Sequence, residues 1–159
     1  MKKLIFFLLM TSLTGFITAD PGHFPYMSYE KAVVYRMTDY EQESIMPGGK
    51  LSTHVIEGTG DTLDATEIEA FLNIIEDTTT YNDIYFRCFS PRHGVVFYNA
   101  ANEPVAHFTI CIECHEVKIT PGLRSRTGTE EAGKLKAVAF VGLRKLAAFI
   151  NKIYPEPED

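Results

Sequence analysis

The sequence lacks tryptophan entirely and has only three cysteines in 159 residues, and its 15 Lys and Arg are outnumbered by 21 Asp and Glu. The absence of tryptophan excludes a Trp-lined binding groove. The net charge of −6 argues against nucleic acid or an anionic membrane surface as the main partner, because both attract basic protein faces. An odd cysteine count also means that at least one thiol stays unpaired in any monomer.

The short motifs that identify common catalytic sites are missing as well. There is no G-x-S-x-G nucleophile motif, no glycine-rich phosphate loop and no HExxH zinc motif. The sequence therefore predicts no reaction and no substrate. With 45% apolar residues, the chain nevertheless has the composition of one ordinary globular domain.

The N-terminal segment has the pattern of a secretory signal peptide. Two lysines precede an apolar run from Leu4 to Met10, which continues more weakly to Ala19. The run is interrupted by Thr, Ser and Gly and is too short for a comfortable membrane span of roughly 20 apolar residues. We therefore expect a signal peptide of residues 1–19 and a mature single domain of residues 20–159 that has no membrane span and is periplasmic or secreted.

Hydrophobic periodicity predicts an α+β fold for the mature domain. A capping box of Asp64 and Glu67 and apolar residues at helical spacing predict a helix from Ala65 to Glu76. A second stripe at helical spacing runs from Leu135 to Ile153. Runs rich in β-branched and aromatic residues predict strands over residues 31–37, 51–57, 84–89, 95–98 and 105–112. The expected architecture is an antiparallel β meander with both helices packed on one face.

The cysteines fall on this meander together with a histidine. If Asn99 pairs with Pro104 at the end of a hairpin, Arg92 lies opposite Cys111 and His93 lies beside it. The remaining two cysteines flank this position along the chain. We therefore expect four side chains to meet at one end of the sheet, namely Cys88, His93, Cys111 and Cys114.

Three thiolates and one imidazole suit a tetrahedral zinc ion, because both ligand types are borderline soft and zinc imposes no geometry of its own. The two-residue gap between Cys111 and Cys114 allows a turn to aim two sulfurs at one ion. The sequence accordingly favours a divalent metal site, with zinc as the expected ion and Cys88, His93, Cys111 and Cys114 as its ligands.

Two alternatives use the same residues differently. An oxidising compartment favours a disulfide with a spare thiol, in a stabilised interaction module without enzymatic activity. Cys88–Cys111 is then the expected bridge if the strand stays straight, and Cys111–Cys114 if the chain turns after Ile112. The run Cys111-Ile112-Glu113-Cys114-His115 also matches the c-type haem attachment pattern, although no Met or His follows it to serve as a second axial ligand.

The segment that carries these residues resembles a group of uncharacterised secreted bacterial proteins. Those proteins share a C-F-x-P-[RH]-H-[GA] turn, a strand that ends in F-Y and a downstream C-x-x-C. Here the pattern spans residues 88–114, and the helix before it is similar too. The resemblance implies a site at Cys88, Pro91, His93, Cys111 and Cys114 but no particular activity, and His115 departs from its pattern.

Overall fold

The computed structural model describes residues 22–38, 44–86, 88–125, 128–129 and 132–155. The expected signal peptide, residues 1–19, lies outside the described residues. Within them, no helix has both the length and the apolar character needed to cross a bilayer.

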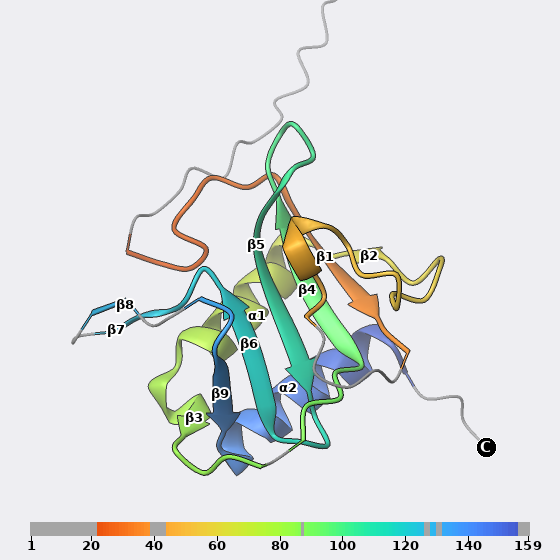
Figure 1. Ribbon diagram of the computed structural model, residues 1–159. Helices are drawn as coiled ribbons and strands as arrows, with labels where there is room; N and C mark the ends of the chain where they lie inside the picture. The colour runs from red at the N-terminus through yellow and green to blue at the C-terminus, as the bar shows by residue number, and fades with distance from the viewer. Residues whose placement is uncertain (1–21, 39–43, 87, 126–127, 130–131, 156–159) are drawn as a thin grey trace, which may run out of the picture.

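Seven strands form one antiparallel sheet in the order β2-β1-β4-β5-β6-β9-β3, and both α-helices lie behind it (Figure 1). The predicted α+β class, with two helices on one face of an antiparallel sheet, is confirmed. The sheet strands are β1 (Lys31–Arg36), β2 (Asp61–Thr62), β3 (Tyr81–Asn82), β4 (His93–Tyr98), β5 (Pro104–Cys111), β6 (Glu116–Thr120) and β9 (Leu135–Val138). The other elements are α1 (Ala65–Glu76), α2 (Phe140–Ile153), the short 3-10 helices η1 (Pro47–Gly49) and η2 (Thr78–Thr80), and the separate hairpin β7 (Arg124–Ser125) and β8 (Gly128–Thr129).

Helix α1 has the predicted bounds because its capping box forms. The Asp64 carboxylate accepts from the Glu67 backbone N–H, and the Glu67 side chain accepts from the Asp64 N–H. These contacts satisfy backbone donors that a helix start leaves without intrahelical partners. The buried side chains Ile68, Phe71 and Ile75 then face the sheet.

The face of the sheet toward α1 and α2, which we call the helix face, holds the main core. Phe71 is fully buried and contacts the rings of Phe97, Phe108 and Phe149. Alternate residues of β4, β5 and β6 supply this face, because successive side chains of a strand point to opposite sides. It is the largest apolar cluster in the described part of the chain.

The opposite face, which we call the loop face, is covered by irregular segments. Ile45 is fully buried, and its backbone N–H donates to the Thr109 hydroxyl of β5. A Cβ added to Gly94 of β4 would approach Ile45 to 2.3 Å, so only glycine leaves room for this loop. The loop face thus holds two smaller clusters, one around Ile45 and one around Cys111.

The predicted register between β4 and β5 is confirmed from His93 to Phe97, with His93 paired to Ile110 and Val96 to His107, but the register shifts after Phe97, so that Pro104 pairs with Tyr98 and not with Asn99. Two predicted strands are wrong. In residues 51–57 only Val55 bridges to Met37, and the described residues among 84–89 belong to no strand. Apolar β-branched and aromatic content indicated extended structure in both, but tertiary context rather than propensity decides which segments join a sheet.

The sequence also assigned the start of the last apolar stripe to a helix. Leu135–Val138 instead forms β9, and helix α2 begins at Phe140. Successive side chains from Leu135 to Val138 point to opposite faces of the sheet, as they do in any strand. The apolar residues follow helical spacing only after Ala139. Strand β6, Glu116–Thr120, was not predicted, since its Glu and Lys obscure the alternation of Val117 and Ile119.

Candidate functional site

A tight hairpin joins β5 to β6 and brings two cysteines together. The His115 N–H donates to the Ile112 carbonyl, which closes the turn directly after Cys111. The Cys114 backbone N–H then donates to the Cys111 sulfur over 3.2 Å. Both cysteines are buried, at 1% and 3% exposure.

The third cysteine reaches this hairpin from residues 83–92, which link β3 to β4 and which we call the connector; residue 87 is outside the described part. The Cys88 and Cys111 thiols both lie close enough to the Cys114 thiol to change its pKa. The Cys111 thiol donates to the Ser90 carbonyl over 3.2 Å. The three cysteines predicted to meet are therefore brought together, and all are reduced.

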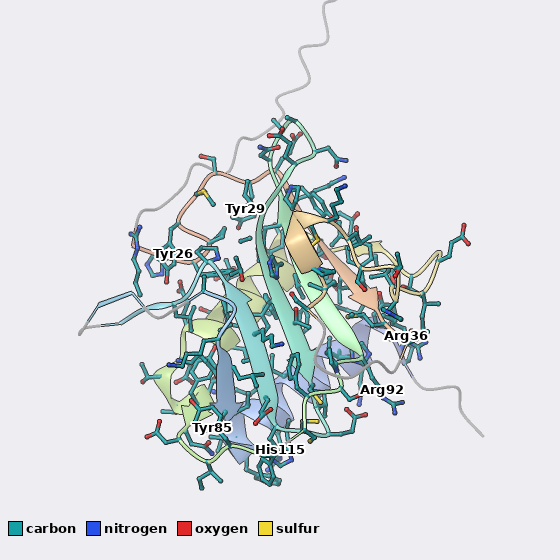
Figure 2. All side chains as sticks on the ribbon, viewed as in Figure 1. Tyr26, Tyr29, Arg36, Tyr85, Arg92 and His115 are labelled. Atoms are coloured by element: carbon teal, nitrogen blue, oxygen red, sulfur yellow. The ribbon has the colours of Figure 1, made fainter. Side chains whose placement is uncertain are left out.

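Several residues of the connector contact the hairpin. The Phe86 ring packs edge-on against His115 with centroids 5.1 Å apart. Cys88 contacts Cys114 and Ser90 contacts Cys111, as described above. Arg92 forms a 3.4 Å ion pair with Glu113. Phe89 lies between them, 1% exposed, and packs on Cys111 and Cys114. Figure 2 places Arg92 and His115 at the same end of the sheet, where β5 ends.

The electrostatics of the cluster disfavour thiolates when no cation is present. The hydrogen bond with Cys114, burial and the charges of Cys114, Glu116 and Glu113 raise the pKa of the Cys88 thiol to about 11. Burial likewise raises the pKa of Cys111 and that of Cys114. None of the three is therefore an activated nucleophile, because a reactive cysteine needs a lowered pKa.

The structure does not bring His93 to the sulfurs. His93 pairs with Ile110 on the neighbouring strand, so it shares the helix face with Ile110, whereas Cys111 points to the loop face. Its ring stacks on Tyr154 after α2, with centroids 6.2 Å apart. Burial and the nearby Arg36 charge lower the pKa of His93 to about 4.

Two residues of the hairpin were not singled out for this site by the sequence analysis. His115 was considered only as a haem ligand, and Glu116, which is 0% exposed, was not considered at all. Glu116 pairs directly with Cys111 across β5 and β6. The signal was available in the spacing Cys111-x-x-Cys114-x-Glu116, but only after the hairpin turn had been placed at residues 112–115.

A covalent haem does not fit these residues in this conformation. Attachment requires two cysteine sulfurs and an axial histidine on a surface open to a large planar ring. Cys111 and Cys114 are instead covered by Phe89 and the connector, and the His115 ring packs against Phe86.

The sulfurs do not surround a single point. Among the residues that the structure describes, no three His, Cys, Asp or Glu side chains are grouped as metal ligands. Cys114 contacts both of the other thiols, and Cys88 is exposed, so the arrangement needs a rotation of the Cys88 side chain to close around an ion.

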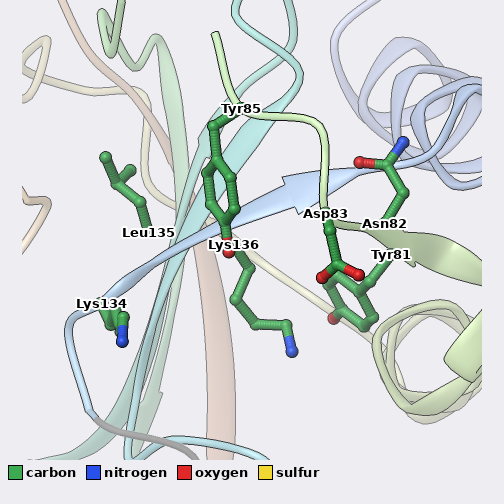
Figure 3. Close-up of a pocket in the computed structure, with 7 residues that line it drawn as sticks. All are labelled: Tyr81, Asn82, Asp83, Tyr85, Lys134, Leu135 and Lys136. Atoms are coloured by element: carbon green, nitrogen blue, oxygen red, sulfur yellow. The ribbon is translucent and has the colours of Figure 1, made fainter. Parts of the chain in front are cut away.

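A pocket of about 410 Å³ lies beside this site at the β3 edge of the sheet (Figure 3). Residues 81–83, Tyr85 and residues 134–136 line it. Leu135 links the two places, since it also packs on the Cys111 cluster. The pocket walls combine two tyrosines with two lysines and contain no cysteine or histidine.

Comparison of the chain with known protein families, with curated proteins and with solved structures finds no match. Any function must therefore be inferred from the residues and the geometry of this chain.

Proposed function

We propose that this chain is an exported bacterial protein that binds one divalent metal ion, zinc in the first place, through Cys88, Cys111 and Cys114. One observation carries the proposal: three thiols from two separate segments converge on Cys114 in the reduced form. Three sulfur ligands are typical of zinc sites, which tolerate the tetrahedral geometry that such a cluster can adopt.

The negative charges around the three cysteines favour the binding of a cation. Cys114 raises the pKa of Cys88 and Cys111 raises that of Cys114, while Glu113 adds negative charge near Cys88 and Cys111 and Glu116 adds it near Cys88. A divalent cation removes this repulsion and displaces the thiol protons, so binding should strengthen as the pH rises. Our proposal requires the exposed Cys88 side chain to rotate toward Cys111 when the ion binds.

In this proposal the metal would be structural. The connector contacts the hairpin through the buried Phe89 and a few polar and ring contacts, and an ion shared by Cys88 and the hairpin cysteines would tie the two segments together. Closed sites with several cysteine ligands contribute directly to folding free energy. We assign no reaction to the site, because no described thiol is activated.

The second candidate is a disulfide-stabilised interaction module. It is favoured by three consecutive exposed apolar side chains on the connector, Ile84, Tyr85 and Phe86, which are 66%, 54% and 49% exposed. A bridge from Cys114 to either neighbour would leave one thiol free, and a Cys88–Cys114 bridge would also tie this segment to the hairpin. Contiguous exposed apolar surface is typical of protein contact sites.

Metal analysis combined with thiol titration separates the two candidates. The full chain is exported to the periplasm of a bacterial host, purified without chelator, and analysed by native mass spectrometry and by thiol counting after denaturation with chelator. The zinc proposal predicts about one zinc per chain and three reactive thiols. Metal-free protein that has lost two hydrogens and retains one thiol overturns it and supports the disulfide.

Single variants then test the ligands. Cys88→Ser should reduce bound zinc at least about tenfold, since the site loses a third of its thiolates. Because Cys88 is exposed, this variant should keep its fold, which circular dichroism checks. His23→Gln is the matched control: His23 contacts Glu76 on α1, and its loss should leave the zinc content unchanged.

A further inference from the structure

Glu116 of β6 is a carboxylate in a place where carboxylates are rarely found. Its side chain is 0% exposed. One oxygen, Oε1, accepts from the Phe86 N–H over 2.9 Å, and the other, Oε2, has no hydrogen-bond partner in the described part of the structure. A buried charged group without a complete set of partners is costly, so such a carboxylate needs either a proton or a cation.

The register places this carboxylate beside the sulfurs. Glu116 stands directly opposite Cys111, and paired side chains of an antiparallel ladder lie on the same face about 5 Å apart at Cβ. On the other side, Glu116 faces Ala137 of β9, whose methyl group offers no polar partner. The nearest sulfur-bearing residue across the ladder is therefore the buried Cys111.

The connector forms hydrogen bonds with both Glu116 and Cys111. Phe86 donates to Glu116, Ser90 accepts from Cys111, and Cys88, which lies between them in the connector, contacts Cys114. The negative charge of Glu116 is one of the influences that raise the pKa of Cys88, so its field reaches that thiol. Lys118 is also on this face, but its ammonium lies 4.5 Å from the centre of the Phe89 ring and does not satisfy Oε2.

We infer that Glu116, through Oε2, supplies the fourth ligand of the metal site, with Cys88, Cys111 and Cys114 as the other three. This inference rests on the proposed function and replaces His93 as the fourth ligand. His93 stacks on Tyr154 on the helix face, whereas Glu116 is on the loop face with the thiols. Carboxylate oxygens bind zinc at about 2.0–2.2 Å, and the Phe86 N–H fixes the orientation of the carboxylate from behind.

The test compares Glu116→Gln with His93→Gln in zinc titrations of the full chain against a chromophoric chelator. Glutamine keeps the size of the side chain and an oxygen for the Phe86 N–H but removes the charge. Glu116→Gln should weaken zinc binding at least about tenfold. His93→Gln should change it by less than about twofold. Equal affinities for wild type and Glu116→Gln, or a larger loss in His93→Gln, overturn the inference.

Cobalt substitution provides a second readout that does not depend on affinity. Co²⁺ at the site should show thiolate charge-transfer absorption of the same intensity in wild type and Glu116→Gln, while the visible ligand-field bands shift because one oxygen donor changes. Cys88→Ser should lose about a third of the charge-transfer intensity. An unshifted ligand-field spectrum in Glu116→Gln, in a variant that binds Co²⁺, counts against carboxylate ligation.

The two proposals fail in different ways. If wild type binds neither Zn²⁺ nor Co²⁺ in its reduced form, the proposed function fails and the assignment of Glu116 fails with it. If wild type and Glu116→Gln bind both ions alike while Cys88→Ser does not, the cysteine site stands and only the fourth ligand is wrong. Circular dichroism of metal-free Glu116→Gln, with Glu116→Asp as a second variant, checks that a loss of binding is not a loss of fold.

Discussion

The two faces of β5 are built on different principles. On the helix face, Phe108 and Ile110 enter a continuous apolar core under α1 and α2. On the loop face of the same strand, Thr109 accepts a hydrogen bond from the Ile45 N–H, and the Cys111 thiol donates one to the Ser90 carbonyl. Both partners belong to segments without regular structure. The helix face is stabilised by one large apolar core, whereas the loop face combines two smaller apolar clusters with specific contacts to chain segments that lack regular structure.

This difference separates stability from the candidate function. The helix face buries large apolar side chains, whose transfer from water dominates folding free energy. The loop face carries buried polar groups whose partners are incomplete, Glu116 Oε2 among the described ones. Polar groups left without partners inside a protein indicate a ligand or a strained site more often than a stabilising role. The faces should therefore respond differently to substitution and to zinc.

The largest effect is expected from the helix face. Phe71→Ala should lower the free energy of unfolding by about 3–5 kcal/mol, because Phe71 is fully buried against three aromatic rings. Urea denaturation with and without zinc measures it, and the loss should be the same in both. Phe140→Ala is the control, since Phe140 is 66% exposed and should cost less than about 0.5 kcal/mol. A zinc-dependent loss in Phe71→Ala would contradict the separation of the faces.

A smaller effect is expected where the loop segment packs on β4. Gly94→Ala should cost about 1–3 kcal/mol, because the new Cβ would lie 2.3 Å from Ile45 Cδ1. Combining it with Ile45→Ala removes the opposing atoms. The double variant should then lose clearly less than the sum of the two single losses. Additive losses in urea denaturation would mean that Ile45 does not pack on Gly94 in solution.

Local signals in the sequence were sufficient for much of the helix face. The Asp64–Glu67 capping box fixed the start of α1 at Ala65, and the Asn99–Pro104 hairpin gave the β4–β5 register. Both depend on residues a few positions apart, whose geometry is largely independent of the rest of the chain. The second helix was predicted too, but its first residues belong to β9, since pairing with β6 outweighs the helical spacing of Leu135 and Val138.

The candidate site was only partly predictable. The sequence predicted that the three cysteines lie close together, from the expected pairing of β4 with β5. It did not predict which face of the sheet His93 points to, although the register was right. Two residues can be close along a ladder and still point to opposite faces of the sheet. His93 pairs with Ile110, one position before Cys111, so its side chain points to the face opposite that of Cys111. Glu116 could not be found because β6 was not predicted, and a buried glutamate is not a pattern that periodicity reveals.

The smallest effect we predict concerns pH and His93. Burial lowers the pKa of His93 to about 4 in the folded protein, against about 6.5 in an unfolded chain. Above pH 6.5 the ring is neutral in both states. As the pH falls from 6.5 toward 4, the unfolded chain takes up a proton that the folded protein rejects, so stability falls, by at most about 2 kcal/mol given the partial exposure of the ring.

His93→Phe isolates this contribution because a phenyl ring can still stack on Tyr154 but cannot be protonated. In urea denaturation with chelator present, the variant should lose less stability than wild type between pH 6.5 and 4. The comparison at pH 8 supplies the baseline, since His93 is neutral there in both states. His107, whose pKa burial also lowers to about 4, is present in both proteins and cancels. Parallel pH profiles would place His93 in solvent, and the assignment of His93 to the helix face, and with it the contrast between the two faces of the sheet, would then have to be revised.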